Sequence, residues 1–356
     1  MVRYHVPTLT VLSVAYPLAP VSPDAAGGAE QILAAIDRAL VAAGHRSFVM
    51  ACAGSRVAGT LIQHRLPPGA VTDAARTQVQ AELRQALVRV PKQEQVDVIH
   101  LHGIDFSAYL PSPGPACLIT LHLPPSWYPP EAFALARPDT WLHGVSAHQH
   151  RHCPSSPALL PPIQNGVPVE ALSTHRHARR SFALMLGRVC PEKGQHLALE
   201  AAHSAGVPVL LGGEVFPYPA HQDYFAEQVA PLLDQRRRWL GPIGFNRKRR
   251  LLSAARCVLI PSLAEETASL VAMEAMACGT PVIAFPSGAL AEIVEPGRTG
   301  FLVRDVAGMA EAIARSSEIE PATCRAVARA RFPLKRMTDA YLARYAELAQ
   351  CRRMAA

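Results

Sequence analysis

The sequence predicts an α/β protein built from two Rossmann-like domains, and three observations support this prediction. Strand-like and helix-like segments alternate along both halves of the chain, which is typical of βαβ units around a parallel sheet. The chain has 356 residues, more than one hydrophobic core usually organises. A proline-rich stretch from Cys153 to Pro168 and a polar, basic stretch over 171–180 interrupt the alternation, so they mark a domain boundary.

The predicted elements of the first half follow from the spacing of apolar residues. Strands are short apolar runs, whereas helices carry apolar residues three and four positions apart. One helix places Ile32, Ile36 and Leu40 on one face, and Gly44 closes it. A second helix is predicted over Thr72–Val90. The predicted strands are Thr8–Val14, Ser47–Cys52, Val96–Leu101 and Ala116–Leu121.

The second half repeats the pattern with a new series of buried strands. Continuous apolar runs without polar alternation indicate strands that are covered on both faces. The predicted strands are Phe182–Leu186, Val207–Leu211, Cys257–Ile260 and Pro281–Phe285.

Composition and charge restrict the class of protein. Apolar residues make up 49% of the chain and charged residues 18%, which favours globular cores over disorder. The net charge of +7 suits an anionic partner such as a nucleotide, a phosphorylated lipid or a membrane surface. No apolar run of membrane-spanning length occurs, and the first residues do not form a secretory signal, so we expect a cytoplasmic protein.

Two glutamates stand out in the segment Pro261–Phe285. Glu266 and Glu274 lie eight positions apart, about 12 Å along a regular helix, so they do not lie side by side on one helix. Glu266 is predicted in the loop after the strand Cys257–Ile260, and Glu274 in a helix that ends at Gly279. A loop before a helix exposes backbone N–H groups that can hold an anion. The segment therefore predicts a pocket for a phosphate and a hydroxylated ligand.

The segment GRVCPEKG, residues 187–194, places two cations directly after a predicted strand. Arg188 and Lys193 would lie at the carboxyl end of the sheet, where α/β proteins place their ligands. Together they can neutralise a diphosphate, although alone they would also suit a solvated turn.

The chain resembles glycosyltransferase family 4, whose signature E-x7-E matches Glu266 and Glu274. Further matching segments occur in the family's order over roughly residues 8–345. They are GGAEQ (27–31), DVIHLHG (97–103), TLH (120–122), NGVP (165–168), GRVCPEKG (187–194) and GRTGFLV (297–303). The resemblance implies a retaining enzyme of GT-B fold, in which two Rossmann-like domains face each other across a cleft. The expected domains are 1–168 for the acceptor, 169–332 for the nucleotide sugar, and a helix in 333–356 that returns to the first domain.

The resemblance also implies roles for individual residues. Arg188 and Lys193 would bind the donor diphosphate and stabilise it as it leaves. Glu274 would accept hydrogen bonds from the ribose hydroxyls, and Glu266 would face the transferred sugar. His122 would lie near the donor sugar and the incoming acceptor.

Backbone groups complete the predicted donor site. Gly27 and Gly28 precede a helix and would cradle the donor phosphate or an acceptor group. The amides of Ser269, Leu270 and Val271 would bind phosphate, and Ile243, within GPIGF, would frame the base. The family usually has Phe-Gly where this chain has Ala268-Ser269, so the donor sugar does not follow from the resemblance.

Neither a metal nor a cofactor is expected. His148 and His152 would share one helix face, but no carboxylate or second cysteine completes a zinc set, and GT-B enzymes typically need no metal. The eight cysteines show no CxxC spacing, which favours buried free thiols.

Two basic runs, 236–238 and 247–250, suit a solvated face, peripheral contact with acidic lipids at the inner face of a membrane, or a nucleotide phosphate. No nucleic-acid motif accompanies them, so no nucleic-acid partner is expected.

The predicted function is retaining transfer of a hexose-type sugar from a nucleoside diphosphate sugar to a hydroxyl acceptor, which could be a glycan, a lipid-linked or a small molecule, as in polysaccharide biosynthesis. Two alternatives remain. One is another GT-B activity, such as a sugar phosphorylase or a nucleotide-sugar epimerase. The other is a non-catalytic subunit that binds a sugar nucleotide.

Overall fold

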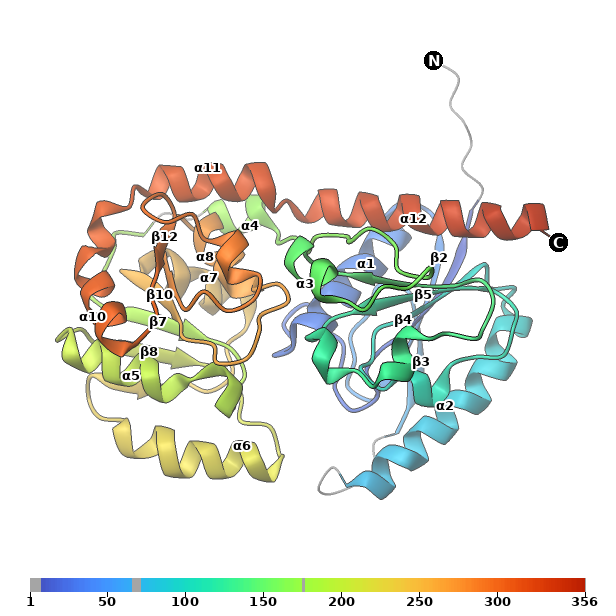
Figure 1. The fold of residues 1–356 in the computed structure, drawn as a ribbon, viewed down its shortest axis with the longest axis horizontal. Coiled ribbons are helices and arrows are strands. Elements are labelled where there is room, and N and C mark those ends of the chain that lie inside the picture. The colour runs from blue at the N-terminus through green and yellow to red at the C-terminus, as the bar shows by residue number, and fades with distance from the viewer. Residues whose placement is uncertain (1–7, 66–71, 175–176, 356) are drawn as a thin grey trace, which may run out of the picture. The chain divides into compact units, whose positions relative to one another are not determined.

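The computed structural model describes residues 8–65, 72–174 and 177–355 (Figure 1). The chain divides into two compact units. Unit 1 comprises Met1–Ile163 with Met337–Ala356, and unit 2 comprises Gln164–Arg336. The boundaries expected from the sequence, after 168 and after 332, lie within a few residues of these.

Unit 1 contains a six-stranded parallel sheet in the order β3-β2-β1-β4-β5-β6. The strands are β1 (Thr10–Val14), β2 (Arg46–Cys52), β3 (Thr60–His64), β4 (Val98–Leu101), β5 (Ala116–Leu121) and β6 (Thr140–Gly144). The helices are α1 (Gly28–Ala42), α2 (Asp73–Gln93) and α3 (Ala147–His152), together with the part of α12 (Leu334–Ala355) from Met337 onward.

Unit 2 contains a second six-stranded parallel sheet, in the order β12-β11-β10-β7-β8-β9. Its strands are β7 (Ala183–Leu186), β8 (Val209–Gly212), β9 (Arg237–Trp239), β10 (Cys257–Ile260), β11 (Val282–Ala284) and β12 (Gly300–Leu302). Its helices are α4 (Val169–Ser173), α5 (Gln195–Ser204), α6 (Pro219–Tyr224), α7 (Phe245–Ala254), α8 (Leu270–Ala277), α9 (Leu290–Ile293), α10 (Val306–Arg315) and α11 (Pro321–Arg331).

Both sheets have the same doubly wound topology. Numbered within its own unit, each sheet runs 3-2-1-4-5-6, the order of dinucleotide-binding folds. The chain reverses direction across the sheet between β1 and β4 in unit 1 and between β7 and β10 in unit 2. The prediction of two Rossmann-like α/β domains is confirmed.

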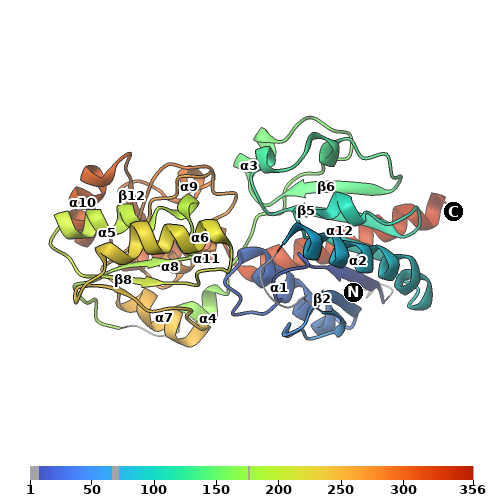
Figure 2. The ribbon, with the colours of Figure 1, turned by 90° about the horizontal axis from the view of Figure 1, so that it is seen from below.

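The sheet of unit 2 is buried on both faces, as continuous apolar strands require. Because successive side chains point to opposite faces, Leu184 and Val258 pack with the core under α8 and α11, while Met185 and Leu259 pack with the core under α5 and α10. Figure 2 shows these helices around the strands.

The sheet of unit 1 differs because one of its faces is polar at the centre. Helix α2 covers the apolar face through Val79, Leu83 and Leu87, and α12 lies on the opposite face (Figure 2). There the hydroxyl of Tyr345 lies 2.6 Å from Nδ1 of His100, and Nε2 of His100 lies 2.7 Å from Oγ1 of Thr120.

The same hydrogen-bonded chain continues to the next strand. Oγ1 of Thr120 lies 2.7 Å from Nε2 of His143, and Nδ1 of His143 lies 2.9 Å from the Gly144 carbonyl oxygen. A carbonyl only accepts, so Nδ1 of His143 carries a proton and its Nε2 accepts from Thr120. Thr120 then accepts from His100, which accepts from Tyr345. Every ring in the chain is satisfied in its neutral form.

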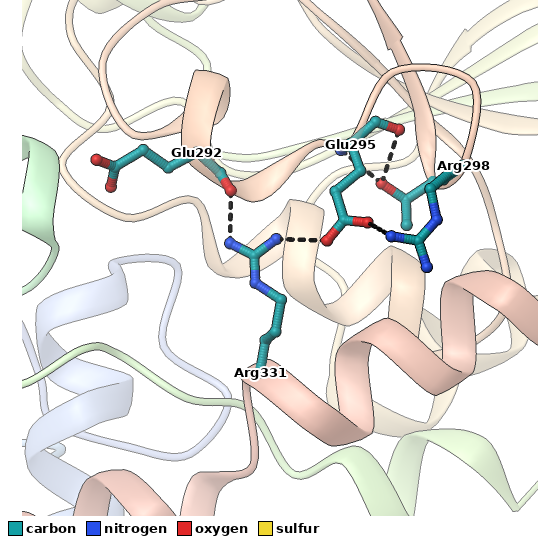
Figure 3. A network of polar contacts seen from close by, with 5 residues as sticks. Glu292, Glu295, Arg298 and Arg331 are labelled. Atoms are coloured by element: carbon teal, nitrogen blue, oxygen red, sulfur yellow. Dashed lines mark hydrogen bonds and ion pairs between the residues drawn. The ribbon is translucent and has the colours of Figure 1, made fainter.

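The GRTGFLV motif forms a turn that leads into β12. Gly297 adopts φ +73° and its N–H donates to the Gly300 carbonyl over 2.9 Å. Arg331 at the end of α11 donates to Glu295 Oε1 (2.9 Å) and to the Glu292 carbonyl (2.5 Å), and Arg298 donates to the other oxygen of Glu295 (Figure 3). The motif therefore joins the strand to α11.

Four strands were not expected from the sequence, namely β3, β6, β9 and β12. All four are the outermost strands of their sheets. The expected strands in both halves are confirmed within a few residues. Among the described residues, no helix is long and apolar enough to cross a membrane.

The buried histidines predict acid sensitivity of unit 1. Burial and the neighbouring His143 lower the pKa of His122 from 6.5 to about 3, and burial, with a smaller contribution from Arg344, lowers the pKa of His143 to about 4. The unfolded chain then binds more protons than the folded chain below pH 6.5, so stability is lost as the pH falls towards 4. Each histidine contributes a slope of up to about 1.4 kcal/mol per pH unit.

Thermal unfolding followed between pH 7 and pH 5 measures this slope. His143→Gln should flatten it, while His203→Gln, at an exposed position in α5, should leave it unchanged. If the melting temperature of unit 1 stays constant over this pH range, the buried histidines do not cause acid sensitivity.

Candidate functional site

Arg188 lies just beyond the carboxyl end of β7, where the backbone passes very close to the next strand. Gly187 donates its N–H to the Gly212 carbonyl over 3.0 Å. A Cβ atom on Gly213 would meet the Gly187 carbonyl oxygen at 1.7 Å, so only glycine fits there. Gln195 donates to the Arg188 carbonyl (2.7 Å), and the guanidinium lies 5.7 Å from the Phe216 ring centroid. The Gly187–Gly212 and Gln195–Arg188 hydrogen bonds thus fix the backbone around Arg188.

Lys193 and Glu266 come together from adjacent strands. Lys193 lies in a single 3-10 turn (Pro191–Lys193) before α5, and Glu266 lies in the loop after β10. Lys193 Nζ is 2.5 Å from Glu266 Oε1, and the Ser262 hydroxyl donates to the same oxygen over 2.5 Å. Burial opposes ionisation of Glu266, but Lys193 and Ser262, with Arg188 nearby, hold the pKa of this carboxyl below its usual value.

The geometry also separates Glu266 from its neighbour. Glu266 is buried, whereas Glu265 is exposed. Glu266 alone of the two faces the cations of the loop after β7.

Glu274 lies inside α8 and is paired with a lysine. Its side chain is 4% exposed, and Oε1 lies 2.5 Å from Nζ of Lys248 on α7. The second carboxylate oxygen can accept further hydrogen bonds, because an ionised carboxylate offers about four lone-pair sites. Lys248 therefore fixes the direction of the carboxylate.

The segment between the two glutamates presents backbone donors. α8 begins at Leu270, and its first carbonyl-to-amide bond runs from Ser269 to the N–H of Met273. The N–H groups of Leu270 and Val271 therefore have no partner within the helix. Ser269 occupies the N-cap position without a side-chain capping bond.

Ile243 lies over the end of β8. A Cβ atom on Gly212 would meet its Cδ1 at 2.2 Å, so the side chain packs directly on that glycine. The predicted residues of unit 2 thus cluster around the carboxyl ends of β7, β8 and β10.

The residues predicted in unit 1 occupy the corresponding edge of the first sheet. α1 begins at Gly28 with Gly27 in extended conformation at the N-cap. The carboxylate of Glu30 folds back to this point, since a Cβ atom on Gly27 would meet its Oε2. The helix start already faces a carboxylate of its own chain.

His122 follows β5 and contacts a second histidine, His102, which follows β4. His122 Nε2 lies 2.9 Å from His102 Nδ1, and the two rings are stacked with centroids 5.2 Å apart. Nε2 of His102 is buried without a hydrogen-bond partner. The backbone N–H of His122 donates to the Tyr128 hydroxyl over 3.0 Å.

Sequence reasoning missed Lys248, Ser262 and His102 as parts of these sites. Lys248 belongs to the basic run 247–250, and its neighbour Arg249 donates to the Ala171 carbonyl over 3.0 Å. In the other run, Arg237 pairs with Asp234 at 2.8 Å, and both lie in or beside β9. One arginine of each basic run therefore makes polar contacts within unit 2, while Arg236 and Arg238 are exposed.

Comparisons with known proteins find similarity to glycosyltransferases. Residues 180–318, most of unit 2, match the family model of glycosyl transferases group 1. D-inositol 3-phosphate glycosyltransferase of Mycolicibacterium paratuberculosis is 32% identical over 212 residues, which cover 54% of this chain and 48% of that protein. The chain spans about half the length of the curated relatives it matches.

Solved structures match over nearly the whole chain. AviGT4, a glycosyltransferase involved in avilamycin A biosynthesis, has a TM-score of 0.67 at 25% identity and covers 96% of this chain and 98% of its own. Anabaena HepE in complex with UDP-glucose has a TM-score of 0.71 at 19% identity, covering 96% and 99%. The fold is the two-domain Rossmann-like fold of GT-B glycosyltransferases.

The ion pair between Lys193 and Glu266 should contribute measurably to stability. A double-mutant cycle with Lys193→Met and Glu266→Gln should give a coupling free energy of about 1–3 kcal/mol, because the carboxylate is desolvated. The coupling should disappear as the pH falls through the depressed pKa of Glu266, since its stabilisation requires the ionised form.

Urea unfolding at pH 7 measures the cycle. The exposed pair Arg315 and Glu318 serves as the control and should show no measurable coupling. An equal coupling free energy in both pairs would refute the claim that the Lys193–Glu266 ion pair stabilises the protein more than an exposed pair does.

Proposed function

We propose that this protein is a glycosyltransferase that moves a hexose-type sugar from a nucleoside diphosphate sugar to a hydroxyl acceptor. The observation that carries the proposal is the convergence of Arg188, Lys193 and Glu266 at the carboxyl ends of the adjacent strands β7 and β10. The family match over 180–318 and the glycosyltransferase relatives support it. HepE, which binds UDP-glucose, supports a nucleotide-sugar donor.

In this proposal the chemistry is centred on the diphosphate. Arg188 and Lys193 neutralise the charge that develops on the leaving diphosphate, which is electrostatic stabilisation of the transition state. The N–H groups of Leu270 and Val271 add donors for a phosphate oxygen. In this role Arg188 and Lys193 would supply the positive charge without a metal ion.

The two glutamates hold the organic parts of the donor. Glu274 accepts hydrogen bonds from the ribose hydroxyls with the oxygen that Lys248 leaves open, and Glu266 accepts from hydroxyls of the transferred sugar. Ile243 lies against the base. These roles correspond to those of retaining family 4 enzymes with the E-x7-E motif, and we assign the protein to that mechanism.

The remaining assignments concern the acceptor side of the reaction and the location of the protein in the cell. His122, with Gly27 and Gly28, belongs to the acceptor side of the reaction. We place the protein in the cytoplasm, with peripheral membrane contact through exposed basic residues and a role in polysaccharide biosynthesis.

Loss of Lys193 or Glu274 should abolish most of the activity without unfolding the protein. Lys193→Ala should lower kcat by about 100- to 1000-fold, comparable with the loss of one oxyanion donor, and Glu274→Ala should weaken binding of the nucleotide. Glu265→Gln, one residue from Glu266 but exposed, should retain near-normal rates. Near-normal sugar transfer by both Lys193→Ala and Glu274→Ala would refute the proposed function.

The donor can be identified by thermal shift. A panel of nucleoside diphosphates and their sugars should raise the melting temperature selectively, because a ligand at 100 times its Kd stabilises by about 2.7 kcal/mol. Product analysis with the stabilising donor then separates transfer from phosphorolysis or epimerisation. A chain that binds a donor but forms no product would instead be a non-catalytic subunit.

A further inference from the structure

Three different metal-ligating side chains meet beside the loop that follows β7. Cys190 and Glu192 come from the 187–194 segment, and His221 comes from α6. One ligand atom from each side chain lies within 4.8 Å of the other two. In the part of the chain that the structure describes, no other group of three such residues converges in this way.

The chemistry of the three donors selects a narrow class of ion. A thiolate, an imidazole nitrogen and a carboxylate oxygen are the ligands of zinc sites, and three protein ligands leave one tetrahedral position for water. Magnesium and calcium prefer oxygen ligands only. The set therefore suits Zn²⁺ or a similar borderline ion.

The turn that carries Glu192 and the ring of His221 are held in place by contacts outside the cluster. Glu192 accepts the backbone N–H of Leu263 at its carbonyl over 2.8 Å, which fixes the turn. The ring of His221 stacks on Phe216, with centroids 6.3 Å apart, and meets Tyr218 edge-on at 5.2 Å. The turn and the imidazole are thus positioned before any ion arrives, which lowers the entropic cost of binding.

The polar atoms within the cluster are incompletely satisfied. Nδ1 of His221 is buried and has no hydrogen-bond partner, and such an atom usually indicates an absent partner. Cys190, 1% exposed, donates its thiol proton to the Arg188 carbonyl oxygen over 3.7 Å. A divalent ion would take the place of that thiol proton and would also give His221 a partner.

We propose that Cys190, Glu192 and His221 form a binding site for one zinc-class divalent cation that ties the 187–194 loop to α6. Binding releases the Cys190 proton to the buffer, because the thiolate is the ligand. Arg188 competes with the ion, since it acts electrostatically on both Glu192 and His221. The ion has no part in the sugar transfer proposed above, and the site stands whether or not that function is correct.

Titration of the purified full-length protein with Co²⁺ tests the site directly. Cobalt bound to a cysteine gives a thiolate-to-metal charge-transfer band in the near ultraviolet, so the band reports the ligand itself. The wild-type protein should show the band with one equivalent of Co²⁺, and Zn²⁺ should displace the cobalt and raise the melting temperature. Mg²⁺ should do neither.

Variants at the three positions provide the decisive comparison. Cys190→Ser should abolish the band, and His221→Ala should weaken Zn²⁺ affinity by at least roughly 100-fold, since loss of an outer-shell partner alone costs about 10- to 100-fold. Glu192→Gln keeps the size of the side chain and should weaken binding by at least about tenfold. Glu192→Gln tests the site even if Cys190→Ser or His221→Ala fails to fold.

Two controls exclude binding elsewhere. Cys351→Ser removes an exposed thiol on α12, and His203→Ala removes an exposed imidazole on α5. Both should bind Zn²⁺ as the wild type does. The proposal is overturned if the band is absent from the wild type, persists in Cys190→Ser, or is lost in Cys351→Ser. Calorimetry showing wild-type Zn²⁺ affinity in both Glu192→Gln and His221→Ala would overturn it as well.

Discussion

The candidate site of unit 2 depends on the pairing of β7 with β10. These strands are far apart in the sequence but adjacent in the sheet, and both run in the same direction. Their carboxyl ends therefore deliver the loops of Arg188 and Glu266 to the same place. The close passage of Gly187 and Gly213 adds β8 to the same junction.

Each buried glutamate of this site has its own lysine, and this arrangement determines their chemistry. Glu266 is paired with Lys193 and Glu274 with Lys248. An isolated carboxylate at such exposure would take up a proton, but the direct lysine contact and the Ser262 hydroxyl favour ionised Glu266. A carboxylate held in this form accepts hydrogen bonds and does not donate a proton. Glu266 is consequently suited to accepting hydrogen bonds from hydroxyl groups rather than to acid–base catalysis.

The sequence predicted the central strands well and the edge strands poorly, for a physical reason. Central strands such as Cys257–Ile260 are apolar on both faces, so their residues report burial directly. The edge strand β9, Arg237–Trp239, carries two arginines, and two of its three residues are exposed, in keeping with the charged side chains that edge strands often carry.

Lys248 was missed for a related reason. A lysine in a basic run gives no sign that its side chain points inward, since only the packing of α7 against α8 determines its direction. Glu266 could be placed in its loop, but its preference over Glu265 needed the side-chain geometry.

The polar face of unit 1 limits what His122 can do. The hydrogen-bonded chain from Tyr345 to the Gly144 carbonyl keeps His100 and His143 neutral, and burial lowers the pKa values of all four neighbouring histidines. One proton between His122 Nε2 and His102 Nδ1 satisfies both atoms, and a second would place two donors 2.9 Å apart. The pair therefore stays neutral at physiological pH. A ligand that reaches His122 or the unpartnered Nε2 of His102 meets a hydrogen-bonding imidazole and not a cation. The cationic side chains Arg188 and Lys193 lie in unit 2, so the two units present chemically different groups.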